Sequence, residues 1–350
     1  MDPKETGAQE RLRVVVVGAT GNVGTSVVRA LAADPRVGSV LGLARRRPDL
    51  DVPKTAWETV DLASEDAAPV LARHLAGAAA VVHLAWRFQP THDPVTTWRT
   101  NVLGSLRVFD AVAAARVPVL VHASSVGAYS PGPKTGPGVT EAWPTHGWPG
   151  AAYCREKAYL ERVLDTYERE HPEIRVVRMR SGFLFKEEAA SEQRRIFAGR
   201  LFPGALLRPE LVPLVPDLDG LLFQALHTDD AAQAYRLAVL ADARGAFNLA
   251  AEPVVDARQL AGLLDARVVR VPRGAVRGAL ATAWRLRLAP ASPDLFDAVL
   301  RLPLMSTERA RRELGWQPTT SSLEALEAFL RGVRTGAGDR TPPLAGHRIG

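Results

Sequence analysis

The chain has 350 residues, of which 47% are hydrophobic, so it can bury the core of one large domain or of two closely joined domains. Its formal net charge of +6 comes mainly from scattered arginines, which are interleaved with acidic residues, as in residues 308–313. This pattern is typical of solvated helix faces and does not indicate a nucleic-acid-binding surface. The chain has one cysteine (Cys154), so we expect no disulfide within it. Residues 1–10 contain no apolar segment, and no apolar run is long enough to span a membrane, so we expect a soluble cytoplasmic protein without a membrane partner.

Short apolar runs alternate with helix-period segments through the first half of the chain. Apolar strands separated by helices are typical of an α/β fold with a parallel, doubly wound Rossmann sheet covered on both faces. The predicted strands are 13–17, 40–44, 79–85, 119–124 and 175–179, and the predicted helices are 24–33, 67–75, 98–114 and 153–170.

A segment dense in proline and glycine, residues 131–150, interrupts this alternation. A loop of this length inside a compact domain is normally functional or disordered. It contains Trp143 and Trp148, which favour a wall of the active site.

After Lys186 the alternation weakens, and a region rich in leucine and proline (201–222) suits irregular structure. A last strand is predicted at 246–250, and helices at 257–264, 275–288, 307–314 and 322–331. We therefore predict a flexible N-terminus (1–10), a dinucleotide-binding Rossmann domain (11–185, to which 220–250 return), a smaller, mainly helical substrate-binding region (186–219 and 251–334) and a flexible tail (335–350).

A glycine-rich loop follows the first strand and leads directly into a helix. Glycines permit a tight turn and close backbone approach, and a helix N-terminus offers free N–H groups to a pyrophosphate. The strand–loop–helix order predicts a dinucleotide site made by Gly18, Thr20, Gly21, Asn22, Val23 and Gly24.

Arginines stand at the end of the second predicted strand, where an acidic residue would select NAD. Arg45 and Arg46 offer a bidentate grip on a 2′-phosphate, so we predict that NADP(H) is preferred, with Arg45 as first choice and NAD(H) as the alternative. Asp61 and Leu62 are placed to meet the adenine, and Leu84 and Ala85 to form a wall on the nicotinamide side.

Tyr153 and Lys157 lie one helical turn apart. A free tyrosine has a pKa of about 10, too high for efficient proton exchange at neutral pH. A cation on the same helix face favours the phenolate and makes the tyrosine a usable acid or base. The pair predicts proton transfer at a carbon–oxygen centre.

These residues together resemble the short-chain dehydrogenase/reductase superfamily, in particular its extended branch, the NAD-dependent epimerase/dehydratase type. The resemblance spans nearly the whole chain. Its motifs are the loop 18–24, Asp61-Leu62, His83-Leu84-Ala85, Asn101–Gly104, Ser124–Tyr129, Tyr153 with Lys157, His227–Ala231, Phe247–Ala250 and Ala310–Pro318.

The resemblance implies roles for individual residues. Tyr153 is the expected general acid/base, and Lys157 is expected to hold the nicotinamide ribose. Ser125 is expected to bond the reacting oxygen, because it lies four residues before Tyr129; Ser124 is assigned to the cofactor site. Asn101 is expected to support nearby backbone. A homodimer that forms through helices 98–114 and 153–170 is also expected. His83 and His122 lie on apolar strands, so we interpret them as core residues rather than metal ligands.

Departures from the family pattern narrow the expected chemistry. Val126 and Gly127 stand where dehydratases carry an Asp-Glu pair, and Phe183 stands near the place of an asparagine that touches the substrate diphosphate in epimerases. The run 180–186 resembles the reductase-type Arg-Pro-Gly-x-x-Tyr-Gly, but differs from it at Ser181, Phe185 and Lys186. The segment 202–223 contains few residues that could bind a phosphate group, apart from Arg208.

We therefore expect hydride transfer between NADP(H) and a small or hydrophobic carbonyl compound or secondary alcohol as the small-molecule substrate. A sugar-nucleotide epimerase that holds NAD is the alternative. A regulator that senses NADP(H) without turnover is the third hypothesis.

Overall fold

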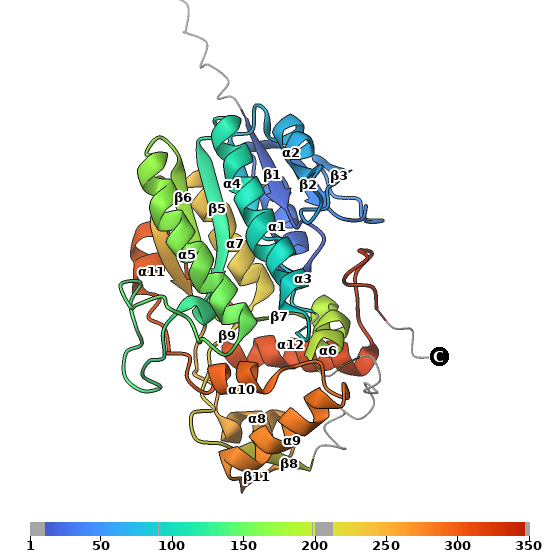
Figure 1. Cartoon of the computed structure of the whole chain (residues 1–350), viewed down its shortest axis with the longest axis vertical. Coiled ribbons are helices and arrows are strands. Elements are labelled where there is room, and N and C mark those ends of the chain that lie inside the picture. The colour runs from blue at the N-terminus through green and yellow to red at the C-terminus, as the bar shows by residue number, and fades with distance from the viewer. Residues whose placement is uncertain (1–10, 90, 198, 200–212, 347–350) are drawn as a thin grey trace, which may run out of the picture.

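A seven-stranded parallel sheet forms the centre of the structure, in the order β10-β6-β5-β4-β1-β2-β3 (Figure 1). The computed structural model describes residues 11–89, 91–197, 199 and 213–346. The strand order reverses between β1 and β4, which is where doubly wound sheets bind their ligands. The strands are β1 (Leu12–Val17), β2 (Val37–Ala44), β3 (Thr55–Thr59), β4 (Ala80–His83), β5 (Val119–Ser125), β6 (Arg175–Ser181) and β10 (Gly245–Leu249).

Helices cover both faces of the sheet, which confirms the predicted α/β fold. In β1, Val14 and Val16 pack in one core with α1, α7 and α11, whereas Val15 and Val17 pack in the other with α2, α4 and α5. Both faces of the strand are buried, so its sequence is continuously apolar. The helices are α1 (Asn22–Ala33), α2 (Ala67–Leu75), α4 (Gly104–Ala114), α5 (Ala152–Glu170), α7 (Thr228–Leu240) and α11 (Glu308–Leu314).

Two elements of this layer differ from the sequence-based expectation. The edge strand β3 was not predicted, because only Trp57 of its five residues is buried and the others are polar or small. The predicted helix 98–114 is interrupted: α3 (Pro94–Trp98) is followed by a π-turn at Arg99–Leu103, and α4 begins at Gly104. π-turns of this kind often occur at functional sites.

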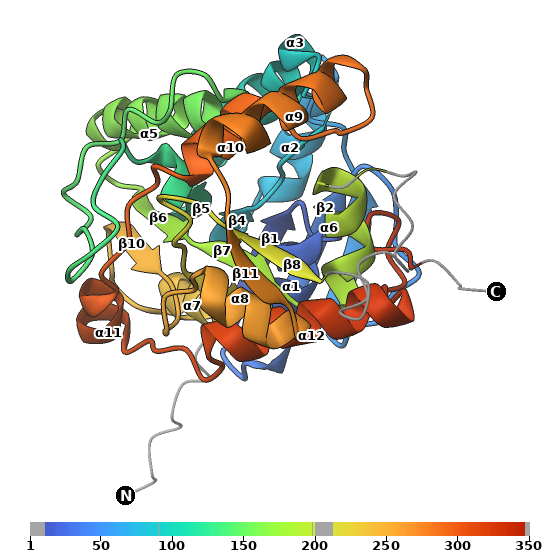
Figure 2. The same cartoon turned by 90° about the horizontal axis from the view of Figure 1, so that it is seen from below.

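A smaller region lies at the C-terminal ends of the strands (Figure 1). Seen from below in Figure 2, α9 and α10 lie on the side opposite α12, and α6 lies beside α12. Its elements are β7 (Phe183–Phe185) paired with β9 (Ala225–His227), β8 (Leu214–Asp217) paired with β11 (Arg267–Arg270), α6 (Ala190–Phe197), α8 (Ala257–Leu264), α9 (Arg273–Arg285), α10 (Pro293–Val299) and α12 (Ser322–Thr335).

Residues 336–346, which we predicted to form a loose tail, pack onto the rest of the chain. Leu344 is fully buried and Thr341 is 2% exposed. The predicted flexible N-terminus (1–10), residues 201–212 of the predicted irregular region, which include Arg208, and the last residues 347–350 lie outside the described residues. Within the described part of the chain, no helix is long and apolar enough to cross a membrane.

Candidate active site

The loop between β1 and α1 brings backbone close to backbone. Gly18 has φ +88°, and a Cβ there would lie 2.5 Å from the amide nitrogen of Ala85. A Cβ at Gly24 would overlap the carbonyl oxygen of Gly18. Both positions therefore require glycine. Helix α1 begins at Asn22, so its first amide groups stand at this loop and suit an anionic group.

Side chains from the C-terminal half of the chain hold this loop in place. Each donates a hydrogen bond from a hydroxyl or an ammonium to a loop or α1 atom, so the loop conformation depends on residues far away in sequence. From sequence, Lys186 was noted only as a departure from the family pattern and Thr228 only as part of the motif 227–231, and Thr341 belongs to no motif. The contacts are Thr341 Oγ1 to Thr20 O (2.9 Å), Thr228 Oγ1 to Asn22 Oδ1 (3.0 Å) and Lys186 Nζ to Thr25 Oγ1 (2.7 Å).

A cavity of about 660 Å³ runs from this loop along the C-terminal ends of the strands. Two of the residues predicted to bind cofactor, Arg46 and Asp61, do not line it; both are exposed, and the Asp61 carboxylate accepts a hydrogen bond from the Ala63 amide (3.1 Å). The other predicted site residues line the cavity together: Gly18, Thr20, Gly21, Asn22, Val23, Gly24, Arg45, Leu62, Leu84, Ala85, Ser124, Ser125, Tyr153 and Lys157.

Tyr153 stands beside Ser125 at the end of β5. The two hydroxyl groups lie near each other, and Ser125 Oγ accepts a hydrogen bond from the Gly127 amide (3.0 Å). The tyrosine ring is stacked on Phe88 (4.5 Å between centroids) and meets Trp86 edge to face (5.6 Å). The aromatic contacts fix the ring, so its hydroxyl is directed toward Ser125 at one point of the cavity wall.

The ammonium of Lys157 is held one turn away on α5. Its Nζ donates to the Ala123 carbonyl oxygen (2.6 Å) and lies 3.5 Å from the centroid of the Trp86 ring. Burial lowers the pKa of Lys157 to about 7, and burial raises the pKa of Tyr153 above its usual value. The direction for Tyr153 is the reverse of the one that the Tyr–Lys spacing predicted.

The affinity for NADPH is expected to fall as pH rises through about 7. Burial raises the pKa of Glu192, on the cavity wall, to about 7, the same value that burial gives Lys157. Above this pH the lysine loses a positive charge and the glutamate gains a negative one, and both changes disfavour an anionic cofactor. Isothermal titration across this range measures the effect.

Two single variants separate these contributions. Glu192→Gln keeps the part of the pH dependence that belongs to Lys157, and Lys157→Met keeps the part that belongs to Glu192. An affinity that stays constant across this pH range in the wild type would contradict the prediction.

Asn101 fixes the backbone that carries Trp86 and Phe88. Its side chain accepts from the Arg87 amide (2.7 Å) and donates to the Arg87 carbonyl oxygen (2.9 Å). It also donates to the buried Glu156 carboxylate on α5 (2.7 Å). Asn101 therefore links the π-turn, the β4 end and the Tyr153 helix, a supporting role in line with the sequence interpretation.

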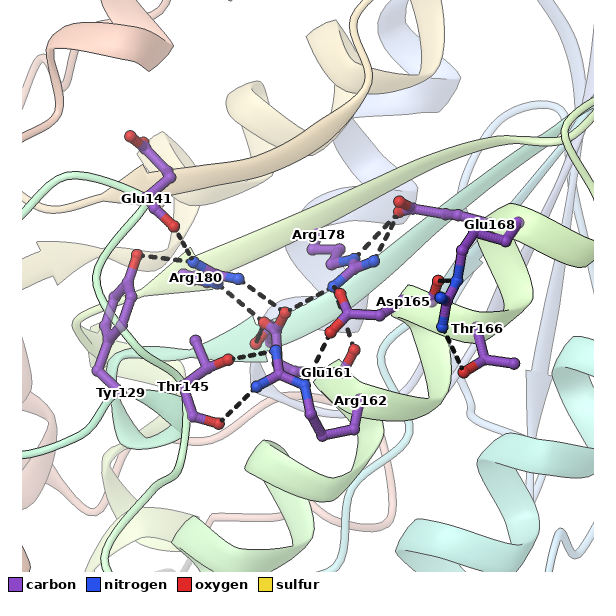
Figure 3. A network of polar contacts seen from close by, with 12 residues as sticks. Tyr129, Glu141, Thr145, Glu161, Arg162, Asp165, Thr166, Glu168, Arg178 and Arg180 are labelled. Carbon is purple, nitrogen blue, oxygen red and sulfur yellow. Dashed lines mark hydrogen bonds and ion pairs between the residues drawn. The ribbon is translucent and has the colours of Figure 1, made fainter.

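A buried ionic network supports the ends of β5 and β6 (Figure 3). The Glu161 carboxylate, 1% exposed, accepts hydrogen bonds from Arg178 (3.0 Å), from Arg180 (2.8 Å) and from the Ser124 hydroxyl (2.5 Å). These bonds lower the pKa of Glu161 to about 2. Ser124 thus anchors β5 to α5 directly before Ser125. Sequence reasoning missed Glu161, which looks like an ordinary polar helix residue.

Glu161→Gln is expected to lower the free energy of unfolding by about 3 kcal/mol at pH 7, because it leaves two buried arginines short of their counter-charge. The pKa of Glu161 is lowered on folding from 4.5 to about 2, so its contribution is present above pH 4.5 and is lost as pH falls toward 2. Urea unfolding of both proteins at several pH values tests this. Glu168→Gln, which removes a half-exposed partner of Arg178, is the matched control and should cost less than about 1 kcal/mol.

The end of the cavity beyond Tyr153 is apolar. Among the described residues, the cationic side chains that line the whole cavity are Arg45, Arg87 and Lys157, and Arg87 Nε is bonded to the Gln89 carbonyl oxygen (2.8 Å). The apolar lining comes from the β4–α3 segment, α6, α9 and α10 and their flanking loops: Phe88, Val126, Phe183, Phe197, Leu280, Leu295, Phe296, Val299 and Leu302.

Trp143 and Trp148 do not form an active-site wall, so that prediction was wrong. Trp143 donates from Nε1 to the Ser130 carbonyl oxygen (3.2 Å), and Trp148 packs under the Arg301 guanidinium (4.5 Å). Neither lines the cavity. Their rings hold the 131–150 loop against the body of the protein, a structural use that composition alone does not distinguish from a site wall.

His83 and His122 lie in the core, with ring centroids 5.4 Å apart. Burial lowers the pKa of His83 to about 3, so its ring is neutral. Its Nε2 is 2.8 Å from Ser105 Oγ. In the described part of the chain, no group of three His, Cys, Asp or Glu side chains is arranged to hold a metal ion.

Comparison with known proteins places this site in context. The model of the NAD dependent epimerase/dehydratase family matches residues 14–250. An uncharacterized protein of Mycobacterium tuberculosis is 24% identical over 345 residues, covering 96% of this chain and 86% of its own length. The L-arabinose 1-dehydrogenase (NAD(P)(+)) of Haloferax volcanii is 35% identical over 113 residues, covering 32% of this chain and 41% of its own.

Among solved structures, the UDP-glucose 4-epimerase of Thermus thermophilus, in complex with NAD, has a TM-score of 0.68 and 20% identity. The alignment covers 92% of this chain and 99% of the epimerase. At this identity the likeness establishes a shared fold.

Proposed function

Because the chain belongs to the NAD-dependent epimerase/dehydratase family, as its sequence predicted, we propose that it is an enzyme that transfers hydride between NADP(H) and a small or hydrophobic carbonyl compound or secondary alcohol. The observation that carries this proposal is the apolar end of the cavity beside Tyr153. Burial of apolar surface there favours an uncharged substrate over a charged sugar nucleotide. The Haloferax dehydrogenase supports the use of a nicotinamide cofactor.

The residues present fit a dinucleotide. The glycine loop leaves no room for side chains, and the buried indole Nε1 of Trp86, on the cavity wall, has no hydrogen-bond partner in the described structure. In the proposal, the loop 18–24 holds the pyrophosphate and Lys157 holds the nicotinamide ribose. The cofactor, when bound, supplies or accepts the hydride.

The protein's own part in the reaction is proton transfer and orientation. During reduction, the Tyr153 hydroxyl donates its proton to the substrate oxygen, and the Ser125 hydroxyl donates a hydrogen bond to the same oxygen as charge develops. The raised pKa of Tyr153 keeps the phenol protonated and ready to donate. Phe88 and Trp86 hold the phenol in position and exclude water from it.

A sugar-nucleotide epimerase is the alternative, and the fold shared with the Thermus epimerase favours it. A diphosphate-bearing substrate needs cations, and of the described residues near the apolar end only Arg87 offers one. A dehydratase has less support. Gly127 stands where such enzymes carry an acid, and even a Cβ there would lie 2.7 Å from Tyr153 Cε1.

A regulator that senses NADP(H) without turnover is a third proposal. It does not need a tyrosine and a lysine in the same cavity, and here both line it.

A homodimer is also proposed, because apolar side chains are exposed on α3, the π-turn and α5. These are Val95, Trp98, Leu103 and Tyr159.

The identity of the co-purified cofactor, read by mass spectrometry and absorbance, tests the proposal first. We expect NADP(H) that exchanges freely, and NADPH consumption with apolar ketones or aldehydes. Tightly retained NAD together with binding of a UDP-sugar would favour the epimerase. Stoichiometric NADP(H) binding without consumption across a broad carbonyl panel would favour the regulator.

A further inference from the structure

A stretch of the C-terminal region concentrates the positive charge of the chain. Residues 266–293 contain six arginines and no aspartate, glutamate or lysine. The formal charge of this stretch equals the +6 of the whole chain, so the remainder is formally neutral. The stretch forms β11, α9 and the loop that follows α9. Figure 1 shows α9, β11 and β8 together at the lower end of the view, away from the central sheet.

The same stretch exposes large apolar side chains. Leu286 and Leu288, in the loop after α9, are 64% and 67% exposed, the highest values for large hydrophobic residues in the described part of the chain. Val268 and Val269 of β11 are 40% and 38% exposed. No residue of α9 is fully buried, although the helix has 13 residues. Such exposure of leucine between arginines marks an interaction surface.

The arginines divide into two groups. Arg273 and Arg277 bind the Asp297 carboxylate of α10 (3.3 and 2.6 Å), so their charge is partly neutralised. The others are exposed and have no ion pair with any described residue. These are Arg267 and Arg270 of β11, and Arg285 and Arg287 at the end of α9. Arg285 and Arg287 alternate with Leu286 and Leu288 along the chain, and we call these four residues the arginine–leucine surface.

Helix α9 is anchored by its opposite side. The Trp284 ring is stacked on His92 (4.1 Å), and its Nε1 donates to Thr91 Oγ1 (2.9 Å). Leu280 lines the cavity. The arginine–leucine surface therefore lies at the C-terminal end of a helix whose inner side already has partners.

We propose that the arginine–leucine surface binds the surface of a bilayer that contains anionic lipids. Arginines pair with lipid phosphate and carboxylate groups, while Leu286 and Leu288 enter the boundary between headgroups and acyl chains. This binding needs no spanning helix, so it revises the sequence-based expectation of no membrane partner, which rested on the absence of an apolar span.

Two other partners fit less well. Nucleic acid offers phosphates but no apolar layer for two exposed leucines, and the aromatic ring of α9 that could stack on bases is already stacked on His92. A second copy of the chain, docked by the same surface about a two-fold axis, would set arginines against arginines. An anionic bilayer complements both the charge and the apolar side chains.

The position of this surface also bears on the substrate. Leu280, on the same helix, lines the apolar end of the cavity, so a bound bilayer lies near that end. This step rests on the proposed function: a hydrophobic carbonyl compound or alcohol partitions into a bilayer and is concentrated there. The membrane binding itself is measured without turnover, so its failure and the failure of the proposed reaction are distinguishable.

Co-sedimentation of the full chain with vesicles tests the proposal. We expect binding to vesicles of phosphatidylcholine mixed with phosphatidylserine, little binding to phosphatidylcholine alone, and a decline as salt is raised. The double variant Arg285→Glu/Arg287→Glu should lower the partition coefficient at least about tenfold. Leu286→Ser/Leu288→Ser should also lower it about tenfold, while the remaining binding keeps its dependence on salt.

Arg311→Glu/Arg334→Glu is the matched control, because it changes the net charge equally at exposed positions on α11 and α12. It should alter binding less than about twofold. Circular dichroism and thermal unfolding check that each variant is folded. No binding to anionic vesicles, or an equal loss in the control variant, overturns the proposal. Binding to a polyribonucleotide instead of vesicles, lost in Arg285→Glu/Arg287→Glu, overturns it in favour of nucleic acid.

Discussion

Tyr153→Phe is expected to lower kcat by about 10³-fold while the dissociation constant for NADPH changes less than about threefold. The variant removes the only atom of the side chain that can donate a proton. The ring itself keeps its stacking on Phe88 and its contact with Trp86, so the site should retain its shape. Stopped-flow turnover with an apolar ketone and fluorescence titration with NADPH measure the two quantities separately.

The chain offers a matched control on the same helix. Tyr159 is 43% exposed and contacts Trp98, away from the cavity, so Tyr159→Phe should leave kcat within about twofold. If Tyr153→Phe retained more than about a tenth of the wild-type kcat, the proton would come from another donor, and Ser125 would be the first to test. A fall in NADPH affinity as large as the fall in kcat would instead indicate a binding role.

The sequence predicted the sheet well because its evidence is local. Most buried strands, such as β1 and β4, are runs of apolar residues, and the covering helices repeat their apolar residues every three or four positions. The edge strand β3 was not predicted, because only Trp57 of its residues is buried in the core. The π-turn around Asn101 was not predicted, because its backbone hydrogen bonds do not change the hydrophobic pattern of the sequence.

The candidate site was predicted in part, for a similar reason. Spacing showed that Tyr153 and Lys157 share a helix face, but their pKa values depend on burial by residues from other elements. Trp86 covers the lysine, and Phe88 covers the tyrosine. Arg45 and Arg46 follow the end of β2 in a bend, where strand alternation no longer predicts direction, and only Arg45 lines the cavity.

Supporting residues far away in sequence were the hardest to find. Glu161 pairs with Arg178 and Arg180 on another element, and Thr341 reaches the glycine loop from near the C-terminus. Neither has a motif, since a buried ion pair or a single hydroxyl contact requires only that two positions meet in the fold. Such contacts become visible only in three dimensions.

The preference for NADPH should depend on Arg45. It follows β2 directly, lines the cavity and has no ion pair with any described residue, so its guanidinium is available to a 2′-phosphate. Arg45→Asp removes that charge-assisted contact and introduces a carboxylate that repels the phosphate. A contact of this kind contributes about 1.5 to 3 kcal/mol, so kcat/KM with NADPH should fall by about 10²-fold.

With NADH the same variant should keep or gain activity, because a carboxylate at this position can accept hydrogen bonds from the ribose 2′-hydroxyl. Arg46→Asp is the matched control: it makes the same charge change one residue further, outside the cavity lining, and should alter the NADPH/NADH ratio less than about threefold. Equal losses with both cofactors in Arg45→Asp would mean that the arginine stabilises the loop rather than selecting the phosphate. If the NADPH/NADH ratio changed only in Arg46→Asp, the 2′-phosphate would be bound by Arg46, outside the cavity described above.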